Sequence, residues 1–262
     1  MVIANYHTHT TRCNHAKGSE RDYIETAIEK GFEVIGFSDH TPQPYPPDVR
    51  SRIRMDMSQL PDYVETLLKL RDEYKEEIRV LIGYEVEYST AYFEKLLTEL
   101  GKYPYDYLIM GQHFVPDEVT GFYTGAATDE EEKLAVYTDL VIEGMETGKF
   151  LYLAHPDLIR FTGDPEVYTN HMRRIIAHSV QNHYPLEVNM YGFTDYRWYP
   201  NDLFFSLASE MGASFVFACD AHDPELVRQP EESVEFMEFL NRNNIKAFEN
   251  ENLLQKLQTL QK

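Results

Sequence analysis

The chain has 262 residues, of which 43% are hydrophobic, and its formal net charge is -20. Single α/β barrels routinely reach this size, so one domain spanning residues 1–262 is expected. The negative charge argues against nucleic acid or an anionic membrane as a partner, because both attract lysine and arginine. The sequence has no apolar stretch long enough to span a bilayer, and its N-terminal apolar run is too short for a signal peptide, so we expect a cytoplasmic protein.

The two cysteines, Cys13 and Cys219, fit a reducing compartment and provide no disulfide framework. Both stand close in sequence to histidines or carboxylates. Because a free cysteine often behaves as a small buried hydrophobe, both are interpreted as packing residues.

Strands and helices are predicted to alternate along the chain. A helix begins at Ser19, which can cap it, and is closed by Gly31. A proline-rich loop over 41–47 excludes regular structure there. The strands are predicted at 2–6, 32–38, 79–88, 105–113, 150–156, 185–189 and 213–222. The later helices are predicted at 58–75, 91–100, 129–147, 165–182, 201–211, 231–241 and 250–260.

This alternation favours right-handed βαβ units and a parallel sheet. Seven strands in one domain favour a closed or nearly closed β/α barrel over an open sheet. In such barrels the chemistry lies at the carboxyl ends of the strands.

Side chains that can bind metals stand near six of these strand ends. His7 and His9 follow the first strand with the i, i+2 spacing that points both to one side. Imidazole is the commonest protein ligand for zinc and similar ions. The predicted metal ligands are His7, His9, His15, His40, Glu85, His113, His155, Asp220 and His222.

Nine ligands are too many for one ion and suit two or three divalent ions with open positions. Histidine-rich ligation favours zinc, iron or manganese over magnesium or calcium, and zinc is the first expectation. Clustered ions of this kind neutralise an anionic substrate and activate a water in phosphate-ester hydrolysis.

A phosphate site also needs an anchor, which arginine supplies best through its planar fork. Arg160 and Arg197 lie in loops on the predicted catalytic side, and Lys17 is a weaker alternative. Asn189 ends the sixth strand. Its side chain is equally suited to a hydrogen bond with a ligand and to one with a loop. Histidines remote from the strand ends are interpreted as surface or packing residues, namely His171, His178 and His183.

Further residues near the strand ends are given supporting roles. Asp39 is expected to orient a neighbouring group, and Glu87 to stand behind the better ligand Glu85. Three tyrosines are expected to line a pocket, namely Tyr191, Tyr196 and Tyr199.

The ordered motifs resemble those of the polymerase and histidinol phosphatase (PHP) superfamily. They are H-T-H at 7–9, S-D-H at 38–40, G-Y-E at 83–85, G-Q-H at 111–113, A-H-P at 154–156 and C-D-A-H at 219–222. The opening H-T-H-T-T-R-C-N-H-A and the later S-D-H-T-P resemble the histidinol-phosphate phosphatase branch. Cys219 stands where many relatives have serine.

The resemblance implies a distorted seven-stranded barrel, similar to a TIM barrel, with a trinuclear metal centre. It implies a first ion on His7, His9, Glu85 and Asp220, with Glu85 bridging to a second. The second ion would also be held by His113 and His155, and the third by His15, His40 and His222.

Together with the ligand series, the resemblance implies hydrolysis of L-histidinol phosphate in histidine biosynthesis, by attack of a metal-bridging hydroxide. Asp220 or a histidine would assist as an acid, and Arg160 and Arg197 would neutralise the phosphate. A phosphoesterase acting on nucleotide phosphates is the alternative. A structural metal-binding module is a third interpretation, which the scarcity of cysteine disfavours. The oligomeric state stays open.

Overall fold

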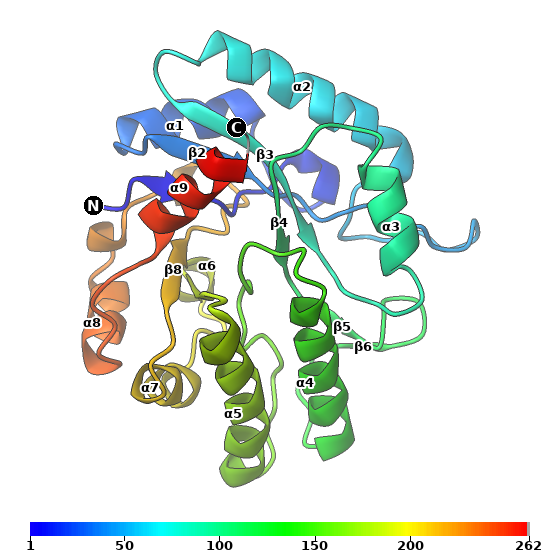
Figure 1. Cartoon of the computed structure of the whole chain (residues 1–262), viewed down its shortest axis with the longest axis vertical. Coiled ribbons are helices and arrows are strands. Elements are labelled where there is room, and N and C mark those ends of the chain that lie inside the picture. Colours follow the sequence, from blue (N-terminus) through cyan, green and yellow to red (C-terminus); the bar gives the residue numbers. More distant parts are fainter. Residues whose placement is uncertain (261–262) are drawn as a thin grey trace.

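The computed structural model describes residues 1–260. Four parallel strands form a curled sheet in the order β1-β2-β3-β4 (Figure 1). They are β1 (Ala4–Asn5), β2 (Val34–Phe37), β3 (Arg79–Val86) and β4 (Tyr107–Met110). In register, Ala4 pairs with Val34 and Gly83 pairs with Tyr107. The prediction of an α/β fold with parallel strands is confirmed.

A second parallel pair, β7 (Leu186–Asn189) and β8 (Phe215–Ala218), is joined to this sheet by isolated bridges. Leu153 bridges to Met110 and to Leu186, and Thr8 bridges to Ala221 beyond β8.

The prediction of a continuous strand over 150–156 is wrong. The described backbone of this segment bonds alternately to its two neighbours: the Leu151 amide donates to the Leu108 carbonyl, and the Leu153 amide donates to the Pro185 carbonyl. A φ of 25° at His155 then turns the chain away. The regular part of the sheet is therefore a half-barrel of four strands.

Helices alternate with these strands, and their ends follow local chemistry. Ser19 caps α1 by accepting the Asp22 amide, and the Asp22 carboxylate accepts the Ser19 amide at 2.7 Å. Gly31, with a φ of 78°, follows the helix as predicted. Within residues 1–260 the α-helices are α1 (Glu20–Glu29), α2 (Leu60–Glu73), α3 (Phe93–Leu100), α4 (Glu131–Glu146), α5 (Pro165–Asn182), α6 (Tyr191–Thr194), α7 (Asp202–Glu210), α8 (Val234–Arg242) and α9 (Asn250–Leu260).

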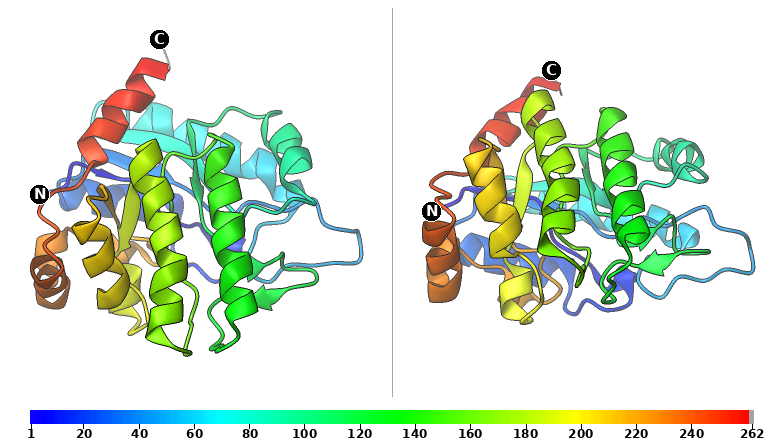
Figure 2. Two further views of the ribbon diagram at one scale, coloured as in Figure 1. Left: turned by 60° about the horizontal axis from the view of Figure 1, so that its bottom comes forward. Right: turned by 90° about the horizontal axis from the view of Figure 1, so that it is seen from below.

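The helices cover the outside of the curl. Helices α4, α5 and α7 lie side by side (Figure 2), while α1 and α2 pack against β2 and β3. The outward residues of the strands form a large apolar core with these helices. Within residues 1–260, no helix combines the length and apolar character needed to cross a membrane.

Two short elements lie where the sequence predicts no regular structure. A hairpin of β5 (Phe114–Val115) and β6 (Phe122–Tyr123) follows β4, and α6 follows β7. Strands of two residues are too short to show an alternating pattern. Both elements lie at the carboxyl ends of the strands, where they bring side chains to the functional site.

The inward face of the curl has its own apolar cluster, which α9 covers with Leu253, Leu254 and Leu257. Burying each leucine stabilises the fold by about 1.5–3 kcal/mol. Asn250, at the start of α9, donates to the Ala4 carbonyl at 2.7 Å and to the Phe217 carbonyl at 2.9 Å. The amino end of the curl is thus filled by apolar side chains, and the polar residues gather at its carboxyl end.

Candidate metal centre

The structure brings the nine predicted ligands together at the carboxyl ends of the strands. All except His15 are buried. A pocket of about 350 Å³ opens above them. Seven of the nine line it, namely His15, His40, Glu85, His113, His155, Asp220 and His222.

Glu85 is the centre of this cluster. It lies on the inward face of β3, and one carboxylate oxygen, Oε1, is 2.7 Å from His155 Nε2 and 3.5 Å from His113 Nε2. The other oxygen, Oε2, is 2.7 Å from His40 Nδ1 and 3.5 Å from His7 Nε2. One carboxylate therefore faces imidazoles from four different segments.

The hydrogen bonds of His7 and His9 show whether a cation fits beside their Nε2 atoms. The Nδ1 atom of His7 is 2.9 Å from the Glu187 carboxylate, and that of His9 is 3.4 Å from the Asp39 carboxylate. A neutral imidazole whose Nδ1–H donates to a carboxylate presents a bare lone pair at Nε2. The two Nε2 atoms face each other at 3.1 Å. Two bare lone pairs at this distance repel unless a cation, either a proton or a metal ion, lies beside them. The Asp220 and Glu85 carboxylates face the same nitrogens, so the set of donor atoms fits a metal ion.

Asp220 completes this part of the cluster. Its Oδ1 is 2.9 Å from His9 Nε2 and 3.4 Å from His7 Nε2. Ligand atoms of these three residues all lie within 4.8 Å of one another.

His15, His40 and His222 form a neighbouring group on the His9 side. The His222 ring stacks on His9 with centroids 4.0 Å apart and lies 4.7 Å from the His15 ring. The Nδ1 atoms of His15 and His222 contact the carbonyls of Cys13 and Asp220 at 2.8 and 3.0 Å. Because Nδ1 donates in both rings, the Nε2 atom of each ring carries a free electron pair.

Charges within the cluster shift the pKa values in opposite directions. Burial alone would lower the pKa of His7, but the carboxylates of Asp220, Glu187 and Glu85 raise it to about 10. These carboxylates favour a cation at Nε2, and a metal ion that binds there displaces the proton. Burial lowers the pKa of His113 to about 3, and positive neighbours contribute to this shift. Burial would raise the pKa of Asp220, but His7 and His9 hold it well below its ordinary value. This shift favours the carboxylate form of Asp220, which is the form that binds a metal ion.

Glu187 lies behind the predicted ligands, and the sequence interpretation gave it no role. It is fully buried in β7 and contacts His7. Its signal was a carboxylate inside the apolar strand P-L-E-V-N, two positions before Asn189 and on the same strand face.

Of the predicted phosphate anchors, the structure brings only Arg197 to the pocket. Its guanidinium lies 4.8 Å from the centre of the Tyr191 ring, and this ring lies 4.9 Å from that of His222. Arg197 also donates to Asp195 at 2.8 Å.

The other predicted substrate contacts lie elsewhere. Arg160 is exposed and stacks on Trp198 at 5.3 Å, because the turn after His155 directs it away from the pocket lining. Lys17 is exposed, with Nζ 4.0 Å from Asp223. Asn189 is buried and donates to Asp220 Oδ2 at 2.9 Å, which places it behind the ligands.

The remaining residues given roles from the sequence fall into three groups. Asp39 contacts His9, as predicted, whereas Glu87 forms an ion pair with the buried Arg54. Tyr191 and Tyr199 line the pocket, but Tyr196 is 95% exposed. The three remote histidines lie on α5 or at its end.

The cysteines are both buried. Cys219 donates its thiol to the Arg228 carbonyl at 3.4 Å. Cys13 lies at the edge of the cluster, where its sulfur and ligand atoms of His15 and His222 are within 4.8 Å of one another.

Apolar side chains also line the pocket. They include Ile53, Phe114 and Leu158. Ile53 belongs to the loop over 41–56, and Glu118 of the hairpin holds this loop by accepting from Ser51 at 2.7 Å and from Arg54 at 2.8 Å.

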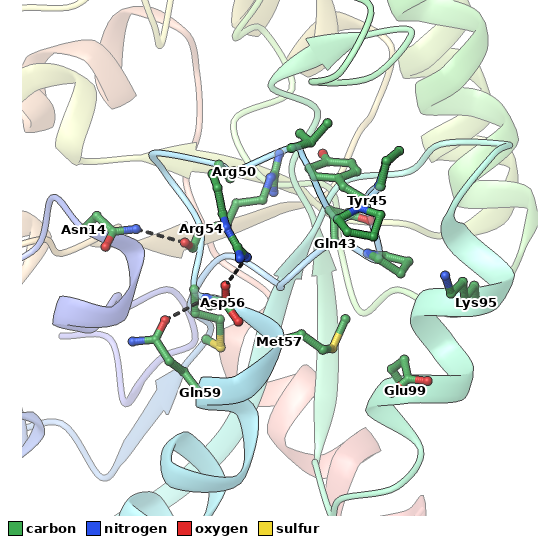
Figure 3. A pocket seen from close by; sticks show the side chains of 16 residues that line it. Asn14, Gln43, Tyr45, Arg50, Arg54, Asp56, Met57, Gln59, Lys95 and Glu99 are labelled. Atoms are coloured by element: carbon green, nitrogen blue, oxygen red, sulfur yellow. Dashed lines mark hydrogen bonds and ion pairs between the residues drawn. The ribbon is translucent and has the colours of Figure 1, made fainter.

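A second pocket of about 430 Å³ lies on the other side of this loop (Figure 3). Arg50 and Asp56 pair at 2.9 Å on one side of it, while Lys95 and Glu99 of α3 lie on the other (Figure 3). Its lining contains none of the predicted metal ligands.

Comparisons with known proteins show which family the chain resembles. A PHP domain profile matches residues 5–190. A probable histidinol-phosphatase of Deinococcus radiodurans is 28% identical over 233 residues, which cover 85% of this chain and 87% of that protein. A probable histidinol-phosphatase of Schizosaccharomyces pombe is 27% identical over 248 residues, covering 84% and 81%.

A solved structure shares the fold. The histidinol phosphate phosphatase of Lactococcus lactis, crystallised with zinc, L-histidinol and phosphate, superposes with a TM-score of 0.70 at 18% identity. The match covers 94% of this chain and 95% of that one.

Proposed function

Because this chain belongs to the PHP domain family, we propose that it is a metal-dependent phosphomonoesterase that hydrolyses L-histidinol phosphate to L-histidinol and phosphate. The observation that carries this proposal is the set of facing imidazole and carboxylate atoms at the strand ends, with Arg197 in the same pocket. The substrate is proposed from the relatives named probable histidinol-phosphatase.

The proposed ligands divide into three groups. A first ion would be held by His7, His9, Glu85 and Asp220, and Glu85 would be shared with a second. The second would also use His113 and His155, and the third His15, His40 and His222. Zinc is the first choice, with iron or manganese as alternatives. Bound divalent ions would neutralise phosphate oxygens and lower the pKa of a coordinated water.

Arg197 binds and orients the phosphate in this proposal. Its guanidinium is fixed by Asp195 and by the Tyr191 ring, so its free N–H groups are already directed. Arg160 would join it only if its side chain left Trp198. The apolar side chains of Ile53 and Phe114 exclude water from part of the pocket.

Asp220 is assigned the proton transfer. Its carboxylate lines the pocket beside His7 and His9. It would accept a proton from the water that attacks phosphorus. As the bond between phosphorus and the ester oxygen breaks, it would pass this proton to the leaving oxygen of histidinol.

Three wider features belong to the same proposal. Bridges at Leu153 and between Thr8 and Ala221 support a distorted seven-stranded barrel. Residues 1–262 form one catalytic domain. A cytoplasmic location without nucleic-acid or membrane partners fits the net charge of -20.

The test is phosphate release from histidinol phosphate compared with sugar phosphates, nucleotides and phosphoserine, with metal content determined on the same sample. We expect a strong preference for histidinol phosphate that a chelator abolishes and zinc or manganese restores. A preference for nucleotides would overturn the substrate assignment, and activity that survives full metal removal would overturn the metal centre.

A further inference from the structure

Strand β7 supplies none of the nine predicted ligands, yet its two inward polar side chains contact three of them. We infer that Glu187 and Asn189 are positioning residues that set the tautomer of His7 and the orientation of Asp220 for metal binding. This inference rests on the proposed metal centre.

Glu187 has a complete set of hydrogen-bond donors around a fully buried carboxylate. Its Oε2 is 2.9 Å from His7 Nδ1. Its Oε1 accepts from the Asn189 side chain at 2.6 Å and from the backbone N–H of His155 at 3.3 Å. Since a buried carboxylate without donors is strongly unfavourable, these contacts fix its position.

The contact with His7 determines which ring nitrogen is free. A carboxylate only accepts hydrogen bonds, so His7 must carry its proton on Nδ1. The Nε2 atom then presents its electron pair toward Asp220 and Glu85, 3.4 and 3.5 Å away. A carboxylate behind a metal-binding histidine acts in this way in other metal sites.

Asn189 connects this carboxylate to Asp220. Its amide nitrogen donates to Glu187 Oε1 and to Asp220 Oδ2, at 2.6 and 2.9 Å. Its amide oxygen accepts the Gly192 N–H at 3.3 Å, which fixes the direction of the amide group. With Oδ2 held from behind, Asp220 directs Oδ1 toward His7 and His9.

Replacement of Glu187 by glutamine tests this arrangement with little change in shape. The new NH₂ group can donate to His7 Nδ1, which would move the ring proton to Nε2 and block the electron pair. If the oxygen faces His7 instead, the NH₂ group opposes the donor of Asn189. Either arrangement weakens metal binding without opening a cavity.

The experiment measures Zn²⁺ affinity of the metal-free full chain by competition with a chromophoric chelator. Wild type is compared with Glu187→Gln, Asn189→Ala and the control Asn250→Ala. Asn250 is also buried, and its side chain bonds three backbone groups at the amino end of the curl. Thermal unfolding of each metal-free variant is recorded in parallel.

We expect Glu187→Gln to bind at least one Zn²⁺ about 10- to 100-fold more weakly than wild type. Its phosphatase activity should recover as free Zn²⁺ is raised. Asn250→Ala should lose thermal stability and keep wild-type affinity. If Glu187→Gln does not fold, Asn189→Ala carries the same expectation of weaker binding.

Wild-type affinity in the folded Glu187→Gln or Asn189→Ala protein would overturn the inference and leave the proposed function standing. A wild-type protein that binds no Zn²⁺ or Mn²⁺ would overturn the proposed function itself. Equal loss of affinity in Asn250→Ala would also overturn the inference, because the effect would then follow from stability alone.

Discussion

The carboxylate of Glu85 occupies the space directly beside Gly111. A Cβ atom at residue 111 would lie 1.9 Å from Glu85 Oε1, far inside van der Waals contact. The backbone cannot withdraw easily, because the Gly111 amide donates to the Val86 carbonyl at 3.0 Å. The glycine of the G-Q-H motif is therefore required by the space that the central carboxylate needs.

Gly111→Ala is expected to displace the Glu85 carboxylate and to lower kcat/KM and metal affinity by at least about tenfold, with a stability cost of about 1–3 kcal/mol. Gly144→Ala in α4 is the matched control, since its Cβ would meet the Met110 side chain at 2.4 Å in the apolar core between the helices and the sheet. Metal titration and thermal unfolding of both variants check this. Similar metal affinities in the two variants would contradict the role given to Gly111.

The two arginines predicted from the sequence are expected to differ in effect. Arg197→Ala should lower kcat/KM by about 10- to 100-fold, because it removes charged hydrogen bonds to phosphate worth about 1.5–3 kcal/mol. Arg160→Ala should have a smaller effect, since Arg160 stacks on Trp198 and does not line the pocket. Steady-state kinetics of both variants decide the matter, and an equal or larger loss for Arg160→Ala would show that its side chain turns inward.

Glu118 is expected to hold the loop over 41–56 in place. Glu118→Ala removes acceptors for Ser51 and Arg54 and frees the segment that carries Ile53 to the pocket wall. We expect KM to rise about tenfold, equivalent to about 1.4 kcal/mol, with a smaller change in kcat and faster proteolysis within the loop.

The control for this loop is Arg50→Ala. The Arg50 side chain is 77% exposed and pairs with Asp56 of the same loop. Unchanged KM and proteolysis in Glu118→Ala, or an equal response in Arg50→Ala, would contradict the role of Glu118 in fixing the loop.

Asp202 is expected to make stability depend on pH in the acid range. Partial burial would raise its pKa, but hydrogen bonds from Arg242 and Asn243, at 2.6 and 2.7 Å, lower it below its ordinary value. A depressed pKa in the folded state stabilises the protein above the unfolded pKa of about 3.9, and this stabilisation disappears as the pH falls through the folded value.

Thermal unfolding of metal-free wild type and Asp202→Asn tests this sign. Wild type should have the higher Tm at pH 7, and the difference should close between about pH 5 and pH 3. The pair is largely exposed, so the effect at pH 7 is at most about 1 kcal/mol. A Tm difference that grows toward acid pH would be the opposite of what this carboxylate predicts.

Much of the site could be predicted because each strand can be recognised from its own local sequence, and the carboxyl ends of parallel strands lie at the same edge of the sheet. Parallel strands end at the same edge, so residues as distant as His9 and Asp220 meet once each is assigned to a strand end. The two-residue period likewise places Glu85 on the inward face of β3, with Gly83 two positions before it.

The rest depends on contacts that no local pattern encodes. Arg160 and Arg197 both follow strand ends, but Trp198 covers one and Tyr191 orients the other. The segment over 150–156 is as apolar as a strand, yet it bonds to its neighbours only in places. The carboxylate of Glu187 stands out within an apolar strand, but its contact with His7, 180 positions away, is not encoded in any local pattern.

Asn250 also has a consequence for the order in which the protein matures. Its side chain bonds to Ala4, 246 positions earlier, and Thr8 beside the first histidines bridges to Ala221. During synthesis, His7 and His9 therefore leave the ribosome long before the segments that surround their strand. Contacts of such long separation form late. The predicted ligands His7 and His9 therefore acquire their final surroundings only after segments more than 200 positions later have folded, and tight metal binding at them is expected to follow that step.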